Sequence, residues 1–395
     1  MADGLLARLA AHPRLRPVRE FLTPPQVPGG RLTARRLANL YLSRWEEARG
    51  RDRLRSKPLR LTVEATNVCN LRCPACFTGM GERGRGRSSM PLDLYRRLLD
   101  ELGDTLFSVD FYNWGEPLLA KHIFTMVEEA HRHGLSTTIS TNFSFPFDAA
   151  RAEQLVTAGL DVLGVSIDGA RQESYEGYRK RGNLEQVLAN CRLVRDAKRR
   201  LGATSPKLVW EFHVFAHNVD DVETARAMAA ELEMEIAVTK GWTVGEEWNP
   251  LSEHRFFWYP TPPARCRFPW QDAVVHNDGG VAPCCGTFYE EDDVGRMTVA
   301  AGDGGAPDFA ALWNGEKMVQ ARALFRDRQL AGAADHVCTE CPITVIWDRW
   351  QHHLATGAPF EPGFGTNDCF NYFWNRRPQR EREPVSPLAS APVAR

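Results

Sequence analysis

Residues 61–77 read LTVEATNVCNLRCPACF, a short β-rich run followed at once by Cys69, Cys73 and Cys76. The run 61–66 predicts a strand, so we expect the three thiols in the loop at its carboxyl end. In barrels of alternating strands and helices, that end carries the active site. Cysteine thiolates are the usual protein ligands of iron-sulfur clusters, and four of them complete a cubane cluster. Three cysteines with no fourth nearby would leave one iron free to bind something else.

The same pattern of a β-rich run followed by an amphipathic segment continues to residue 241. Strands separated by helix-length segments pair in parallel only through right-handed crossovers. We therefore predict an α/β fold, a partial (β/α)6 TIM-like barrel, followed by a small C-terminal iron-sulfur α+β domain. Two strands fewer than a full barrel leave one side open. The six predicted strands are 61–66, 107–114, 136–142, 161–169, 207–215 and 235–241.

Outside the predicted barrel, the chain divides by composition. Apolar residues recur at helical spacing after Thr33, a candidate N-cap, and predict an N-terminal helical arm over residues 1–60. The barrel is expected over 61–245, and a segment rich in proline and aromatic residues then leads into a cysteine-rich domain over 246–375. Residues 376–395 are charged, rich in proline and poor in large apolar groups, which predicts a disordered tail.

Composition and charge exclude several classes of partner. The 395 residues include 49 basic and 50 acidic side chains, for a net charge of -1. Such a balance provides no field to attract nucleic acid or anionic lipid, so neither is an expected partner. No apolar run approaches the roughly 20 residues of a membrane helix, and the N-terminus lacks a signal-peptide pattern, which predicts a cytoplasmic protein. The ten cysteines are clustered, which in a reducing cytosol favours metal or cluster ligation over disulfides.

The CxxxCxxC spacing of Cys69, Cys73 and Cys76 resembles the signature of the radical S-adenosylmethionine (SAM) superfamily. The resemblance implies a [4Fe-4S] cluster on these thiols, with SAM bound at the open iron. It also implies a reducing partner such as flavodoxin or ferredoxin, whose electron cleaves SAM to a 5'-deoxyadenosyl radical that takes a hydrogen atom from the substrate. A zinc knuckle is the alternative for these cysteines. Zinc sites usually pair two half-sites, however, and no second pair lies nearby.

Residues at the ends of later strands resemble the SAM-binding motifs of this family, in order. Gly115 and Glu116, in the stretch FYNWGEP, resemble the GGEP motif that binds the amino group of SAM, with Trp114 in place of the first glycine. Ala75 stands where relatives often carry an aromatic residue against the adenine. A strand end with a turn would look similar at each position alone, but their order on successive strands favours a SAM site. The resemblance also assigns to this site Thr141 and Asn142, Ser166 and Asp168 near the ribose and carboxylate, and Arg179 as a partner of that carboxylate.

The second group of cysteines lies within residues 266–342, in the runs CRFPW, NDGGVAPCC and CTECP, and resembles a SPASM or shorter twitch domain. The resemblance implies one auxiliary [4Fe-4S] cluster, because four thiolates saturate a cubane, and leaves Cys285 and Cys369 as spare residues. Tetrahedral zinc is the alternative on geometry. Cys191 lies on the apolar face of a predicted helix, so we expect it in the core. The four implied ligands are Cys266, Cys284, Cys338 and Cys341.

Two substrate classes fit these motifs. We favour the dehydrogenation or epimerisation of a small carbohydrate or aminocyclitol, and a peptide or protein maturase is the alternative. Oxidising an alcohol radical requires loss of a proton, so a base near the barrel mouth would help. Glu211 and His213 alternate onto one side of the fifth predicted strand and are the predicted catalytic pair, unless that side faces outward. Lys240, Asp348 and His352 are further candidates. A non-catalytic iron-sulfur or zinc protein is disfavoured, because it would not need the SAM-site residues.

Overall fold

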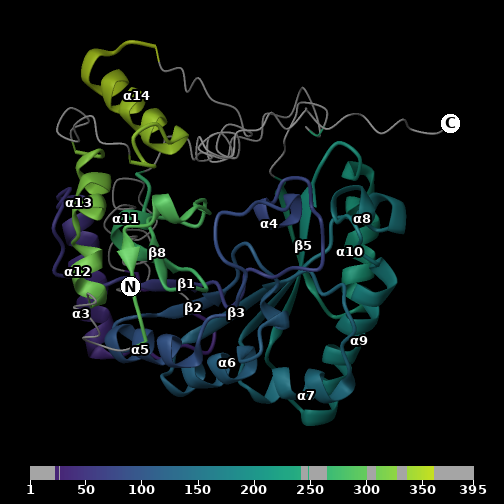
Figure 1. The fold of residues 1–395 in the computed structure, drawn as a ribbon. Coiled ribbons are helices and arrows are strands. Elements are labelled where there is room, and N and C mark those ends of the chain that lie inside the picture. Colours follow the sequence, from purple (N-terminus) through teal and green to yellow (C-terminus); the bar gives the residue numbers. More distant parts are fainter. Residues whose placement is uncertain are drawn as a thin grey trace, which may run out of the picture.

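The computed structural model describes residues 23–25, 27–241, 248, 265–299, 308–326 and 336–359. Within these residues, one curved sheet runs through the molecule in the strand order β6-β5-β4-β3-β2-β1-β7-β8-β9 (Figure 1). Cys369 and the predicted disordered tail over 376–395 lie outside the described residues. The strands are β1 (Arg60–Val63), β2 (Ser108–Phe111), β3 (Ser136–Thr141), β4 (Val162–Ser166), β5 (Lys207–Val214), β6 (Glu235–Lys240), β7 (Asp272–Val275), β8 (Gly280–Ala282) and β9 (Gly295–Arg296).

The six strands β1 to β6 run parallel to one another and are joined through helices, which confirms the predicted α/β fold. The sheet is not closed, because β6 and β9 form its two edges, so the barrel is partial as predicted. Figure 1 shows α6, α7, α9 and α10 along the outer face of the sheet. The α-helices are α3 (Ala34–Ala48), α4 (Phe77–Met80), α5 (Leu92–Leu102), α6 (Ile123–Arg132), α7 (Ala149–Thr157), α8 (Gln172–Tyr178), α9 (Leu184–Leu201), α10 (Val222–Glu231), α11 (Phe268–Gln271), α12 (Phe309–Trp313), α13 (Glu316–Ala323) and α14 (Pro342–Thr356).

The second cysteine-rich part of the chain extends the barrel sheet. It contains a hairpin of β7 and β8, which pair in antiparallel fashion. Gly279 in the turn has a φ of 90°, a backbone conformation that favours glycine. β7 also pairs in parallel with β1, so that Arg60 lies opposite Asp272. This pairing was not predicted, because local sequence patterns do not reveal which strand the outer edge of a hairpin will join.

Side chains alternate across β5 and separate the core from the inner face of the sheet. Trp210 and Phe212 are fully buried in the main hydrophobic core. Glu211 and His213 point to the opposite side and are half-buried. In the strand register, Glu211 lies directly opposite Ser166 of β4. Helices cover the outer face of the sheet (Figure 1). Glu211 and His213 alternate with the core residues Trp210 and Phe212, so they lie on the opposite, inner face of the partial barrel.

Helix α3 links the N-terminal part of the chain to two distant segments. Thr33 caps the helix as predicted, because its hydroxyl accepts a hydrogen bond from Arg36 N at 3.2 Å. The buried Arg36 guanidinium donates to the carbonyl of Gly134 at 2.6 Å. Farther along the helix, Ser43 Oγ donates to the carbonyl of Trp270 at 3.1 Å. The helix therefore contacts both the barrel and the segment that leads into β7.

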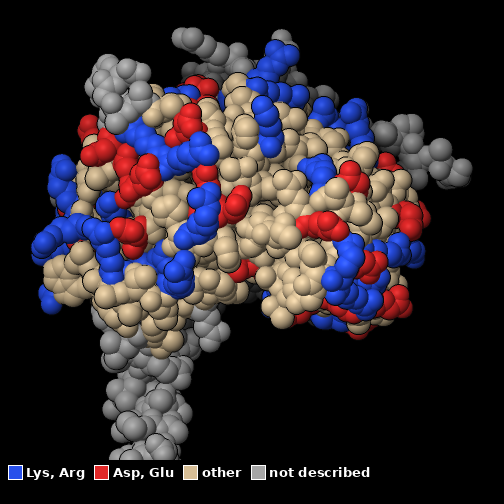
Figure 2. Space-filling model, turned by 90° about the horizontal axis from the view of Figure 1, so that it is seen from below, with Lys and Arg blue, Asp and Glu red and all other residues tan. Residues whose placement is uncertain are grey.

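Acidic and basic side chains are interspersed over the face drawn in Figure 2, in keeping with the chain's 49 basic and 50 acidic residues. Among the helices of the described residues, none is both long enough and apolar enough to cross a membrane.

Candidate active site at the carboxyl ends of the strands

The loop after β1 brings the three cysteines of the CxxxCxxC stretch around one apolar cluster. Cys69, Cys73 and Cys76 pack there with Tyr178 and Phe215, and Cys76 is the N-cap residue of α4. The rings of Tyr178 and Phe215 stack with their centroids 4.3 Å apart. Sequence reasoning did not select these two aromatic residues. Phe215 comes directly after β5 and Tyr178 is the last residue of α8, and neither position belongs to a recognised motif. They give the cysteine loop an aromatic wall.

The chemistry of this donor set fits an iron-sulfur cluster. Burial raises the pKa of Cys69 and of Cys73 to about 12, even with Arg179 beside Cys73, so these thiols would stay protonated until a metal cluster binds. Asn142 Nδ2 donates to Cys69 Sγ at 3.5 Å, as a group that stabilises a thiolate would. In the part of the chain that the structure describes, no three His, Cys, Asp or Glu side chains converge tightly enough to hold one metal ion. A cubane cluster suits such wider spacing, because each thiolate binds a different iron.

Gly115 and Glu116 form a closely packed loop after β2. A Cβ on Gly115 would lie 1.8 Å from the carbonyl oxygen of Thr66, so only glycine fits there. The Glu116 carboxylate is 2% exposed and accepts hydrogen bonds from Thr141 Oγ1 at 2.6 Å and from Asn142 N at 2.7 Å. Burial raises the pKa of this carboxyl to about 7. The carboxyl therefore ties the end of β2 to the end of β3, and its position favours a role in shaping the loop.

Asp168, at the end of β4, holds two other predicted site residues. Arg179 Nε donates to Asp168 Oδ2 at 2.6 Å, while the backbone N–H of His213 donates to Asp168 Oδ1 at 2.8 Å. The Nδ1 atom of His213 lies 3.0 Å from the same oxygen. Burial alone would raise the pKa of Asp168, but the charges of Arg179 and His213 outweigh it and lower the pKa to about 2. Arg179 also lies close enough to Cys73 to favour its thiolate.

Glu211 is held on the inner face by two serines. Ser140 Oγ donates to Glu211 Oε2 at 2.7 Å, and Ser166 Oγ donates to the same oxygen at 3.2 Å. A Cβ on Gly164 would lie 2.3 Å from Glu211 Oε1, so the glycine makes room for the carboxylate. Ser166 thus contacts Glu211, although sequence reasoning assigned it to the SAM site. Sequence reasoning missed Ser140. Side chains alternate along β3, so Ser140 lies on the same side as Asn142, and this alternation could have identified it.

A charged group occupies the inner face near the start of β1, and sequence reasoning missed it. Arg60 Nε lies 3.5 Å from an Asp110 carboxylate oxygen and 3.9 Å from one of Asp272. Arg267 Nε donates to Asp272 at 2.9 Å. Burial raises the pKa of Asp110 to about 6. Asp110, within the mainly apolar run FSVDF, was the available signal. Arg60 reaches it across the β1–β2 pair, but Asp272 joins the group only through the unpredicted pairing of β7 with β1.

The cysteines of the second group also lie together. Burial and the neighbouring thiols of Cys285, Cys338, Cys341 and Cys266 raise the pKa of Cys284 well above its usual range. These four half-buried thiols come from three separate stretches of chain and, among the described residues, do not converge on a single metal ion, so their wider spacing fits a cubane site in which each thiolate binds a different iron. The structure therefore brings together all four cysteines that sequence reasoning chose as auxiliary ligands.

The two remaining described cysteines have different surroundings. Cys285 neighbours Asp272 and Tyr112, so it lies between the auxiliary cysteines and the inner face of the sheet. Burial raises its pKa to about 11. Cys191 is 1% exposed within the main hydrophobic core, which confirms the prediction that it is a core residue.

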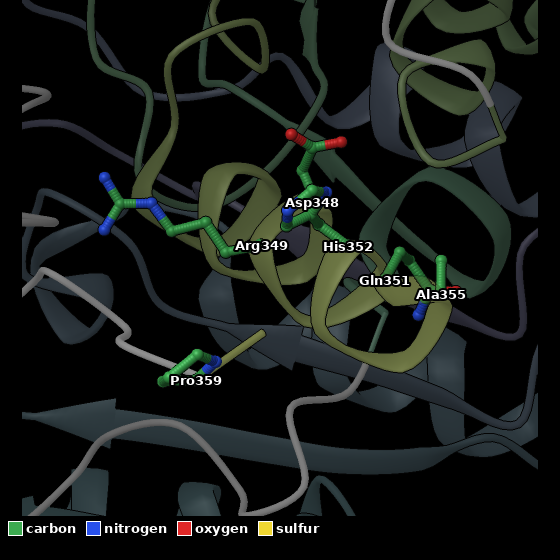
Figure 3. A pocket seen from close by; sticks show the side chains of 6 residues that line it. All are labelled: Asp348, Arg349, Gln351, His352, Ala355 and Pro359. Carbon is green, nitrogen blue, oxygen red and sulfur yellow. The ribbon is translucent and has the colours of Figure 1, made fainter. Parts of the chain in front are cut away.

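Three further base candidates lie elsewhere. Lys240 is the last residue of β6. Asp348 and His352 are four residues apart on α14, which lies above α11 and the β7–β8 hairpin in Figure 1. They border a pocket of about 730 Å³, and Figure 3 shows the side chains of Asp348 and Arg349 pointing away from one another. The pocket is lined by Asp348, Arg349, Gln351, His352, Ala355 and Pro359.

Two family models match the chain in order along the sequence. Residues 63–224 match the model of the radical SAM superfamily. Residues 266–342 match the model of the SPASM iron-sulfur cluster-binding domain. The first match runs from the end of β1 through β5 and includes the three-cysteine loop, and the second contains the four auxiliary cysteines. The first model implies a SAM-binding [4Fe-4S] cluster and SAM, and the second implies auxiliary iron-sulfur clusters.

Individual relatives are distant. An AdoMet-dependent heme synthase of Methanosarcina barkeri is 26% identical over 52% of each chain. The mycofactocin maturase MftC of Mycolicibacterium smegmatis is 26% identical over 50% of each chain. The chain thus spans about half the length of these relatives. Among solved structures, SuiB of Streptococcus suis is similar with a TM-score of 0.51 at 13% identity, over 73% of this chain and 72% of that one, a likeness of fold alone.

Proposed function

We propose that this chain, a radical SAM protein with a C-terminal SPASM domain, binds SAM beside Cys69, Cys73 and Cys76 and removes a hydrogen atom from a small hydroxyl-bearing substrate. The single observation that carries the proposal is the convergence of these thiols with Asn142, which bonds Cys69, at the mouth of a partial barrel. When bound, the cluster and SAM would supply a 5'-deoxyadenosyl radical as the hydrogen-atom acceptor. The net reaction is an oxidation or an epimerisation of a carbohydrate or aminocyclitol.

In this proposal, different residues around the cysteine loop bind different parts of SAM. The narrow loop at Gly115 presents its backbone to the amino group, while Glu116 keeps that loop in place from behind. Arg179 is the cation for the SAM carboxylate, and Asp168 fixes its position through the 2.6 Å contact. The stacked rings of Tyr178 and Phe215 supply an apolar wall for the adenine, a role that Ala75 cannot fill.

The inner face supplies the substrate site in this proposal. Its polar groups suit a ligand with several hydroxyl or amino groups, since Glu211, Asp110 and Asp272 all offer carboxylate oxygens. Oxidation of an alcohol removes a proton and a second electron after the hydrogen atom has left, and a cluster held by the auxiliary cysteines Cys266, Cys284, Cys338 and Cys341 would be the acceptor of that electron. Glu211 is half-buried and, among the described residues, accepts hydrogen bonds from two neutral serines, so it is the proposed acceptor of that proton. His213, whose ring lies 3.0 Å from Asp168, would assist in positioning.

Peptide maturation is the second candidate. The observation in its favour is the relation to MftC, which is named a mycofactocin maturase. In either case a flavodoxin or ferredoxin is the proposed electron donor. Adding candidate aminocyclitols or short peptides to the reduced enzyme separates the two candidates, because only a true substrate should accelerate release of 5'-deoxyadenosine.

Anaerobic reconstitution tests the proposal directly. We expect about eight irons per chain, corresponding to two cubane clusters, and release of 5'-deoxyadenosine from SAM on reduction. Changing Cys69, Cys73 and Cys76 together to Ala should leave about four irons and abolish SAM cleavage. A chain that binds zinc in place of iron and never cleaves SAM would refute the radical reaction. Loss of all iron from the triple variant would refute the separate auxiliary cluster.

A further inference from the structure

Trp114 connects the SAM-motif loop to the C-terminal part of the chain. Its indole Nε1 donates to the carbonyl of Thr287 at 2.7 Å, and its ring lies edge-on to Phe288 with centroids 5.9 Å apart. The ring also lies edge-on to Phe77, the residue after Cys76, with centroids 4.7 Å apart. Phe77 and Phe288 stack on one another at 5.0 Å. The Trp114 side chain therefore touches the segment that follows Cys76 and the segment that follows Cys284 and Cys285.

The backbone of Trp114 is fastened to the same two parts of the molecule. Its N–H donates to Glu64 Oε1 at 3.1 Å, just beyond β1. The other oxygen of Glu64 lies 3.1 Å from Nδ1 of His276, just beyond β7. Glu64 and His276 are 1% and 0% exposed, so this contact is shielded from solvent. The loop that begins at Trp114 and continues into Gly115 is thus attached to the C-terminal part through both its backbone and its indole.

The segment after the three-cysteine loop has its own attachment. Arg85 binds Asp293 through two hydrogen bonds of 2.6 and 2.9 Å and lies 3.2 Å from Asp278. Its side chain is 1% exposed. A Cβ on Gly84 would lie 2.5 Å from the Phe288 ring, so the segment packs directly against that ring. Residues 77–88 therefore follow the three-cysteine loop directly in the chain and pack against the C-terminal part.

Cysteines of both groups contact the same aromatic cluster. Cys76 from the first group and Cys284 and Cys338 from the second pack against one aromatic cluster built on Phe77 and Trp114. Displacement of either cysteine group must move rings that the other contacts, because packed interiors transmit such shifts. This arrangement differs from two independent sites on one chain.

We propose that Trp114 is a positioning residue that couples the two cysteine sites, so that a formed auxiliary site holds the three-cysteine loop and the Gly115 loop in their binding geometry. This inference rests on the proposed function for the identity of the two sites. The tryptophan that replaces the first glycine of the GGEP pattern is, in this account, the element that transmits the coupling.

Amide hydrogen exchange over residues 77–88 tests the coupling in the reconstituted full chain. Removing the auxiliary ligands through C284A with C338A should raise exchange there about tenfold, and W114F, which keeps a ring but loses the indole donor, should do the same. The chain with all three substitutions should exchange less than about twofold faster than the chain with C284A and C338A alone, because both changes act through the same contact. The matched control is W210F, which loses an indole bond of 2.8 Å to the Ile167 carbonyl in the barrel core, away from the C-terminal part. Its effect should add fully to that of C284A with C338A.

The outcomes separate this inference from the proposed function. If the wild-type chain holds about eight irons and cleaves SAM, full additivity of W114F with C284A and C338A would overturn the coupling and leave the function standing. Non-additive exchange in a chain that holds zinc and never cleaves SAM would support the coupling and overturn the function. Unchanged exchange at 77–88 after loss of the auxiliary ligands would also overturn the coupling.

Discussion

Arg179 and Asp168 form a buried ion pair, in which Arg179 Nε lies 2.6 Å from Asp168 Oδ2 and the aspartate side chain is fully buried. The pair joins the end of β4 to the end of α8, and the arginine also lies near Cys73. Asp168 therefore determines where the arginine sits. The sequence motif identified both residues, but the pairing shows that they act together.

Replacing Asp168 with Asn should destabilise the apoprotein by about 3–5 kcal/mol, because the buried Arg179 would lose its counter-charge. The folded pKa of Asp168, about 2, is below its ordinary value of 3.8. The stabilisation is therefore fully present above about pH 4 and is lost as the pH falls towards 2. The difference between wild type and D168N should shrink by about 1 kcal/mol between pH 6 and pH 3 in urea unfolding. A difference that grows towards low pH would contradict this pairing.

Replacing Gly79 with Ala should disrupt the three-cysteine loop. A Cβ there would lie 2.5 Å from the backbone oxygen and 2.6 Å from the backbone nitrogen of Cys73, and neither atom can move without moving the loop. We expect G79A to fall from about eight irons per chain to about four after reconstitution. Gly86 is the matched control, because a Cβ there would meet nothing within 4 Å. G86A should keep the full iron content, and an equal loss in both variants would contradict the steric explanation.

The periodicity of apolar residues along the sequence predicted the parallel strands of the barrel and the side of β5 on which its polar residues lie. The alternation of β-rich and amphipathic runs was enough for six parallel strands, because each strand and its helix bury surface locally. The alternation of β5 likewise placed Glu211 and His213 on one face. The two cysteine groups were identified from their spacing and from the family resemblance, and their role as cluster ligands stays a prediction. These features depend on residues that are close together in the chain.

Contacts between distant segments were not predictable in this way. The partner of β7 could not be read from its own residues, so the meeting of Arg60 with Asp272 was missed. The role of Glu116 was similarly hidden, because its hydrogen-bond donors lie on the next strand. Trp114 stood out as a departure from a motif, and only the fold shows that its indole reaches Thr287.

Replacing Arg85 with Ala should destabilise the apoprotein by about 3–5 kcal/mol, because Asp293 would be left without its charge partner in a buried site. The control is Arg35, whose pair with Asp104 is exposed on both sides, at 73% and 72% of the side-chain surface. R35A should cause little measurable change, since water already screens that pair. Urea unfolding of both variants gives the comparison. Similar effects for the two arginines would argue against a buried attachment at residues 77–88.

Replacing Glu211 with Gln should separate SAM cleavage from product formation. The glutamine keeps the size of the side chain, but it cannot accept the proton that our proposal assigns to Glu211. We expect product formation to fall roughly 100-fold while 5'-deoxyadenosine is still released, as liquid chromatography of both compounds would measure.

Gly164 provides a second way to disturb the same carboxylate. A Cβ at Gly164 would lie 2.3 Å from Glu211 Oε1, so G164A should push the carboxylate away from Ser140 and Ser166 while leaving its charge intact. We expect G164A to lower product formation in the same direction as E211Q, and to leave the iron content unchanged, because neither residue contacts a cysteine loop. Product formation at the wild-type rate in E211Q would remove Glu211 from the mechanism. A loss in G164A alone would then show that the shape of the inner face, and not a proton acceptor at residue 211, limits the reaction.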